Sequence, residues 1–138
     1  LLSMMLRQIF LLVNRQIQEK KGNNYIQEEI EKATYYFNDN YHKDISIEEY
    51  AASRHVSTCW FIRSFKHYTG MTPMQYILSI RIANAQNLLE TTSYTISEIA
   101  AIVGYDNPLY FSRLFKKQKG VSPKEYRSAL FQFTSSPQ

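Results

Sequence analysis

Two arginines, Arg63 and Arg113, occupy matched places in two segments of this sequence that resemble each other. Residues 63–66 read RSFK, and residues 113–116 read RLFK. An arginine on an exposed helix can donate two parallel hydrogen bonds to O6 and N7 of guanine, a contact that discriminates between bases by about 1–3 kcal/mol. A surface salt bridge is the alternative role of a single arginine. Because the position is repeated, base recognition is the favoured hypothesis for both residues.

The two segments belong to a longer internal repeat. Residues 70–76 (GMTPMQY) line up with 120–126 (GVSPKEY), and residues 47–51 line up with 96–100. The upstream offset is one residue shorter, so the second copy has one extra residue in the turn between its two short helices. Two copies of a unit of roughly 30 residues are too few for a solenoid. They indicate a duplicated functional module.

Each copy of the repeat is expected to form a short helix, a turn and a second helix. This is the spacing of a helix-turn-helix, whose second helix enters the major groove of DNA. The first turn contains His55, and the second contains Gly104 at the matching place. Glycine takes a positive φ without a Cβ clash, and histidine tolerates that region better than most residues. Both turns are therefore expected to form, the first with slight strain.

The second helix of each copy has a face toward the core and a face that could contact bases. Ile62 lies on the outward face, where it fits a thymine methyl group; burial in the core is its alternative. Cys59 lies there too, and is expected to be an inert small residue because the chain has no second cysteine for a redox switch. The residues expected to face the core are Phe61, Ser64 and Phe65 in helix 57–68, and Phe111, Leu114 and Phe115 in helix 108–118.

Lysines near the ends of the second helices are expected to contact phosphates and to supply affinity that does not depend on sequence. The alternative is a solvated helix end, where the helix dipole favours lysine. Backbone amides at helix N-termini can also bind phosphate, and two such termini are expected near Ser46 and Thr95. The predicted phosphate contacts are Ser46, Lys66, Thr95, Lys116, Lys117 and Lys119.

Charge is distributed unevenly along the 138 residues, whose net charge is +4. Residues 1–53 carry six Lys/Arg against eight Asp/Glu, whereas residues 54–138 carry ten against four. Positive charge concentrated in one part of a chain favours an anionic partner such as nucleic acid. A helical module that binds only protein is the alternative, but it would not explain the repeated arginines.

Other classes of protein are disfavoured by composition and motifs. The single cysteine excludes an internal disulfide framework and fits a reducing compartment. The histidines and the cysteine have no metal-ligand spacing, and no phosphate-binding glycine loop or hydrolase motif occurs, so we expect no catalysis, metal or cofactor. The longest apolar stretch, residues 1–13, is shorter than the roughly 20 residues that span a bilayer, and it lacks the features of a signal peptide.

Hydrophobic periodicity is helical nearly throughout, and no stretch alternates with period two, so the predicted fold is all-α. N-cap signals mark helix starts at Ser46, Thr72, Thr95, Asn107 and Ser122, and Gly22-Asn23-Asn24 is expected to end the first helix. The predicted helices are 3–20, 25–39, 46–53, 57–68, 73–90, 95–102, 108–118 and 122–130.

The helix 73–90 is expected to join the two modules. At 1.5 Å per residue it would be about 27 Å long. This length could hold the two second helices near one turn of DNA, about 34 Å, from each other.

Residues 1–20 carry an apolar stripe that a solitary helix would expose to water. We expect this helix to pair two chains as a homodimer, or to pack on the rest of its own chain. The chain opens on Leu rather than Met, which indicates a piece of a longer protein. The stripe consists of Leu2, Met5, Leu6, Ile9, Val13 and Ile17.

The second module closely resembles the signature of AraC/XylS-type transcription regulators. Residues 81–89 look like the linker helix of that family, and residues 45–76 match its first module, so that the resemblance covers about residues 25–130. The segments that carry it in the second module are Ile99–Ala100, Val103–Asp106, Tyr110–Lys117 and Gly120–Arg127.

This resemblance implies a bacterial transcription regulator that is cytoplasmic and nucleoid-associated and that binds double-stranded DNA. Activation of transcription is an implied role, and RNA polymerase is a further candidate partner. Two helix-turn-helix subdomains would read consecutive major-groove segments. The implied organisation is a remnant of a sensing or dimerisation domain (1–22), a first subdomain (25–76), a linker helix (73–90), a second subdomain (91–131) and a frayed tail (132–138). The implied base-reading residues are Thr58, Cys59, Ile62 and Arg63 on the first recognition helix, and Pro108, Leu109, Ser112 and Arg113 on the second.

The sequence departs from the family pattern at two places. His55 replaces the glycine that is more usual in the first turn. Pro108 and Leu109 have no side-chain hydrogen-bond donor, so the second helix is expected to read few bases or mostly DNA shape.

Overall fold

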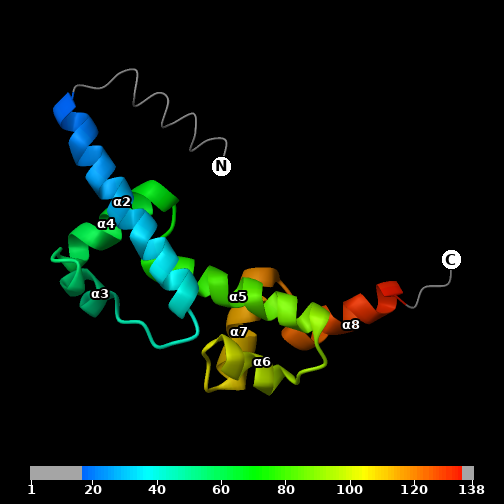
Figure 1. Cartoon of the computed structure of the whole chain (residues 1–138). Coiled ribbons are helices and arrows are strands. Elements are labelled where there is room, and N and C mark those ends of the chain that lie inside the picture. The colour runs from blue at the N-terminus through cyan, green and yellow to red at the C-terminus, as the bar shows by residue number, and fades with distance from the viewer. Residues whose placement is uncertain (1–16, 135–138) are drawn as a thin grey trace.

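The computed structural model describes residues 17–134, and every regular element within them is an α-helix (Figure 1). The predicted all-α fold is confirmed. The helices are α2 (Ile17–Asn40), α3 (Ile47–Ser53), α4 (Thr58–Thr69), α5 (Pro73–Thr91), α6 (Ile96–Val103), α7 (Pro108–Lys119) and α8 (Pro123–Thr134).

The long helix α5 is shared by two helical modules. Helices α2, α3 and α4 gather around its first half, and α6, α7 and α8 gather around its second half (Figure 1). We call these groups, each with its half of α5 and its loops, the first module and the second module. Each has its own hydrophobic core. To the first core α5 contributes Ile77 and Ile80, and to the second it contributes Ile82, Ala85 and Leu89.

The helices start where the capping chemistry predicts. Thr72 and Thr95 form complete capping boxes with Gln75 and Glu98, in which each pair exchanges two side chain-to-backbone hydrogen bonds. Several helices begin one residue later than predicted, because the capping residue itself has extended backbone angles.

The predicted helix end at Gly22-Asn23-Asn24 is wrong, because α2 runs without a break from Ile17 to Asn40. A glycine inside a helix costs only about 1 kcal/mol relative to alanine, and packing can outweigh that cost. The hydroxyl of Tyr68 on α4 donates a hydrogen bond to Asn23 Oδ1, with 3.5 Å between the two oxygens, and Ile26 packs against the first core. Tertiary contacts therefore override a local sequence that is typical of a turn.

The chain ends also differ from expectation. Helix α8 continues to Thr134, so residues 132–134, which were expected to fray, are helical. Most of the predicted helix 3–20, with its apolar stripe, lies outside the described residues. No helix within 17–134 is both long and apolar enough to cross a membrane.

Candidate nucleic-acid interface

The two turns of the repeat share two backbone features, a residue with positive φ and a hydrogen bond that spans five residues. His55 has a φ of 61° and Gly104 a φ of 109°. The predicted positive φ at both places is confirmed. In each turn the next amide donates to a carbonyl five residues earlier, which closes the end of the preceding helix. These bonds join Val56 to Ala51 at 3.1 Å and Tyr105 to Ala100 at 2.8 Å.

Helix α4 presents the outward face that its periodicity predicts. Cys59 and Arg63 are exposed, and Thr58 is half-buried at the start of the helix. Ile62 is 37% exposed, so the alternative that places it in the core is wrong. The part these four residues play in base reading stays a prediction.

Helix α7 presents an equivalent face with a more apolar tip. Leu109 is 70% exposed and belongs to neither hydrophobic core. Arg113 is exposed, and Pro108 and Ser112 are half-buried. Pro108 and Leu109 can make van der Waals contact with a ligand, but neither side chain has a hydrogen-bond donor.

Tyr110 is a surface residue that sequence reasoning missed. Its side chain is 50% exposed, and its ring makes an edge contact with Tyr105 at 5.9 Å between centroids. Its counterpart in the repeat, Trp60, packs against the first core. The repeat alone would therefore have predicted burial. Leu114, expected in the core, is only half-buried.

The cations of α4 and α7 have no acidic partner among the described residues. Both ion pairs in this part of the chain use Glu29, which pairs with Lys32 at 3.7 Å and with Arg54 at 2.7 Å. The salt-bridge alternative for Arg63 and Arg113 is therefore disfavoured. The four lysines predicted to contact phosphate are exposed in or near the last turns of the two helices, at Lys66, Lys116, Lys117 and Lys119.

The two helix N-termini predicted to bind phosphate have different surroundings. Ser46 lines a groove of about 480 Å³ together with Thr58 and Ile62, beside the outward face of α4. The Thr95 amide instead donates to the Glu98 carboxylate at 3.3 Å, so this donor already has an acceptor. Phosphate contact at either terminus stays a prediction.

An ion pair joins α2 to the first turn. Arg54 donates two hydrogen bonds to the Glu29 carboxylate, from Nε at 2.9 Å and from Nη2 at 2.7 Å. Glu29 is only 6% exposed. The hydrogen bond from Arg54 lowers the pKa of this carboxyl below its ordinary value, although burial acts in the opposite direction. The pair holds the end of α3 against α2.

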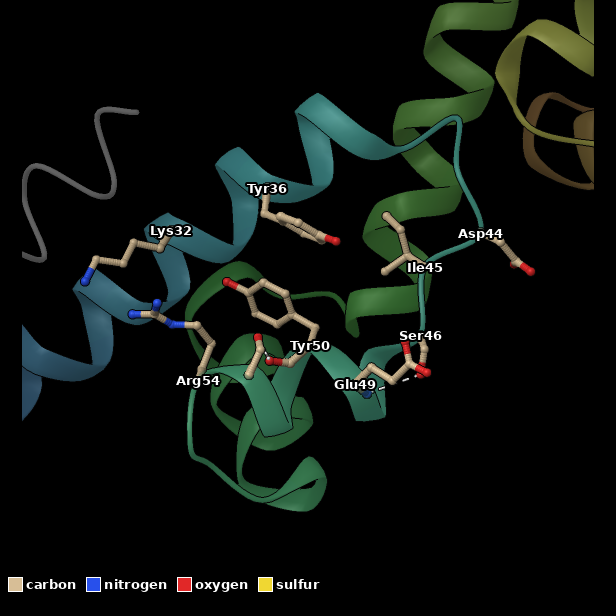
Figure 2. A pocket seen from close by; sticks show the side chains of 9 residues that line it. Lys32, Tyr36, Asp44, Ile45, Ser46, Glu49, Tyr50 and Arg54 are labelled. Atoms are coloured by element: carbon tan, nitrogen blue, oxygen red, sulfur yellow. Dashed lines mark hydrogen bonds between the residues drawn. The ribbon is translucent and has the colours of Figure 1, made fainter.

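A pocket of about 560 Å³ lies between α2 and α3 (Figure 2). The rings of Tyr36 and Tyr50, with centroids 4.9 Å apart, lie in its middle. Burial raises the pKa of Tyr50. Lysine and arginine line one side of the pocket and acidic residues the other, so its charge favours neither anions nor cations. Within the described chain, no group of three His, Cys, Asp or Glu residues is placed to hold a metal ion.

Residues 50–129 match a family described as a helix-turn-helix domain. This range contains both turns and both outward helices. The chain belongs to the AraC-type helix-turn-helix family. The resemblance to AraC-type regulators that the second module predicts is confirmed.

Relatives and solved structures of this family match most of the chain. The lactose operon transcription activator of Staphylococcus xylosus is 38% identical over 102 residues, which are 74% of this chain and 37% of that protein. The C-terminal domain of AraT, a response regulator from Geobacillus stearothermophilus, has a TM-score of 0.70 at 36% identity, covering 72% of this chain and 84% of that one. The DNA-binding domain of AdpA, solved in complex with a target DNA, has a TM-score of 0.68 at 32% identity, covering 72% and 90%. The chain spans about a third of the length of curated relatives such as the lactose operon activator.

Proposed function

We propose that this chain is the DNA-binding part of an AraC-type transcription regulator, with α4 and α7 as recognition helices in two consecutive major-groove segments. The observation that carries the proposal is the pair of matched arginines. Arg63 and Arg113 are exposed at equivalent places on the second helices of two modules, and the turn of each module has a residue with positive φ at the matching position. The similarity to the AdpA domain, which was solved with a target DNA, supports the same conclusion.

Each recognition helix would contribute residues of different chemistry. Arg63 and Arg113 would each donate two hydrogen bonds to guanine, and Ile62 and Leu109 would contact thymine methyl groups. Lysines at the helix ends and the amides near Ser46 and Thr95 would bind phosphates. The remaining base-reading residues would be Thr58 and Cys59 on α4, and Pro108 and Ser112 on α7.

Selection of binding sites from random duplexes, followed by gel-shift titration in rising salt, tests this proposal. We expect one sequence class to be enriched, and its affinity to fall by roughly 10³ between 50 and 200 mM salt if six phosphates are contacted. Lys116→Ala should weaken binding to all sequences alike and flatten the salt slope by about 0.9. No enrichment, together with salt-independent binding, would indicate a module that binds only protein.

We also propose that residues 1–20 pair two chains. Their apolar stripe supports this idea, since burying one such side chain stabilises by about 1.5–3 kcal/mol. A dimer would bind a doubled site more tightly without new base contacts. In sedimentation, the wild-type chain should dimerise at high concentration. The double variant Leu6→Asp/Ile9→Asp should be monomeric and should still bind a single DNA site. A wild-type chain that stays monomeric at every concentration tested contradicts the pairing.

RNA polymerase is a further proposed partner, in the cytoplasm at the nucleoid. The name of the Staphylococcus xylosus relative, a transcription activator, supports this role. A selected duplex placed upstream of a weak promoter should give more transcript when this chain is added to purified bacterial RNA polymerase. Unchanged or reduced transcript would contradict activation by this chain.

A further inference from the structure

Arg81 lies in the middle of α5, where the two modules meet. Its Nε donates a hydrogen bond to the carbonyl oxygen of Tyr41 at 2.7 Å, and its Nη2 donates to that of Lys43 at 2.8 Å. Both carbonyls belong to the loop between α2 and α3, in the first module. The guanidinium group also lies over the ring of Tyr105, with Cζ 4.8 Å from the centroid. Tyr105 belongs to the turn of the second module, so one side chain contacts both modules.

The backbones of the two modules also approach each other here. A Cβ atom on Gly104 would lie 2.9 Å from the carbonyl oxygen of His42 and 3.1 Å from Cζ of Arg81. Only a residue without a side chain allows the second turn to lie this close to the loop of the first module. Tyr41, in the same loop, packs against both hydrophobic cores.

Beside this junction the modules are separated by open space. A cavity of about 560 Å³ lies there, with Ile45 on the side of the first module and Asn107 and Tyr110 on the side of the second. Helix α5 fixes the distance between the modules along its axis. A module packed on a single helix can nevertheless roll about that helix, and the contacts of Arg81 oppose such a roll.

We propose that Arg81 is a positioning residue that sets the angle between α4 and α7, and thereby the spacing between the two DNA segments that this chain accepts. This inference rests on the proposed function. One base pair inserted between the segments moves the second by about 3.4 Å and turns it by about 35° about the DNA axis. When Arg81 holds the two modules at a fixed angle, the chain should bind the altered duplex more weakly. Without these contacts the modules can reorient, and the altered duplex should bind nearly as well as the selected one.

The test compares a duplex selected by the wild-type chain with versions that have one base pair inserted or removed between the two segments. Wild type should bind the altered duplexes at least about tenfold more weakly. Arg81→Ala should bind the selected duplex about three- to tenfold more weakly, and its preference over the altered duplexes should fall to about threefold or less. Arg81→Lys keeps the charge but not the planar two-donor fork, and should lose part of the preference.

Arg127→Ala is the matched control. Like Arg81, Arg127 donates hydrogen bonds to backbone carbonyls. Its three acceptors, the carbonyls of Leu89, Thr92 and Tyr94, all lie in the second module. This variant loses the same charge and the same kind of contact, and should keep the wild-type spacing preference. Thermal melting followed by circular dichroism verifies folding, and Arg81→Lys carries the test if Arg81→Ala does not fold.

Two outcomes overturn the role of Arg81. One is a folded Arg81 variant that keeps the wild-type spacing preference, and the other is a wild-type chain that has no spacing preference. Failure of the proposed function looks different, because the wild-type chain would then enrich no duplex at all, before any variant is compared.

Discussion

In the first module the turn before α4 contains His55 with a φ of 61°, and in the second the turn before α7 contains Gly104 with a φ of 109°. The helix after each turn buries a pair of phenylalanines and exposes an arginine at the same place. The tips of the two helices differ. Helix α4 starts with Thr58 and Cys59, whereas α7 starts with Pro108 and Leu109. The repeat has kept the scaffold that positions the helix and changed the residues that would meet the first bases.

The anchoring of the two turns differs as well. The residue before His55 is Arg54, which binds Glu29 through two hydrogen bonds. The matching residue before Gly104 is Val103, which is fully buried in the second core. One position in the repeat therefore forms an ion pair in one copy and packs in the hydrophobic core in the other. The exchange is tolerated because α2 supplies a carboxylate beside the first turn.

The largest effect is expected from the matched core residues Phe65 and Phe115, both fully buried. Phe65→Ala and Phe115→Ala should each lower the free energy of unfolding by about 3–5 kcal/mol, through lost burial and the cavity left behind. Urea denaturation followed by circular dichroism measures both losses. A loss below about 1 kcal/mol in only one variant would break the equivalence of the two cores.

The next effect concerns the two arginines. Arg63→Ala and Arg113→Ala should each weaken binding to the selected duplex by about 1–3 kcal/mol, with little change in melting temperature. Because the two side chains lie on different modules, the losses should be roughly additive. Gel-shift titration of both single variants and the double variant measures this. Unchanged affinity in the double variant would remove the assignment of both residues to base reading.

Loss of the ion pair between Glu29 and Arg54 should lower the melting temperature by a smaller amount that depends on pH. The pKa of Glu29 is lowered in the folded chain, so its contribution to stability is present at neutral pH and is lost as pH falls below its ordinary value of 4.5. Glu29→Gln should therefore melt at a lower temperature than wild type at pH 7, and the gap should shrink in acid. Glu28→Gln, an exposed neighbour, is the control and should melt like wild type. A gap that does not change with pH contradicts the role of the ion pair.

The smallest effect sharpens the difference between the helix tips. Replacing thymine by deoxyuridine in the segment bound by α7 removes one methyl group, and should weaken binding by about fourfold if Leu109 contacts it, since a buried CH₂ contributes about 0.8 kcal/mol. Leu109→Ala should be insensitive to the same replacement. Equal sensitivity in wild type and variant would show that the methyl group meets another residue.

Features that depend on neighbouring residues were predictable from the sequence. The caps at Thr72 and Thr95 form because the partner residues are three positions away, and the positive φ at His55 and Gly104 follows from their place in the repeat. The outward positions of Arg63 and Arg113 follow from helical periodicity. The roles of these arginines are a further step that periodicity alone does not decide.

Features that depend on the packing of distant helices were not predictable. The helix continues through Gly22 because α2 packs on α4. The pair between Glu29 and Arg54 depends on the register of α2 against α3, and the contacts of Arg81 join segments about 40 residues apart. No local pattern marks these arginines as different from those on a solvated surface.

Guanine N7 methylation interference on the selected duplex tests most directly whether α4 and α7 occupy consecutive major-groove segments. With the wild-type chain we expect two clusters of guanines whose methylation blocks binding, about 10 base pairs apart. Arg63→Ala should abolish interference in one cluster, and Arg113→Ala should abolish it in the other. A single cluster, or loss of the same cluster in both variants, would contradict two recognition helices on one DNA site.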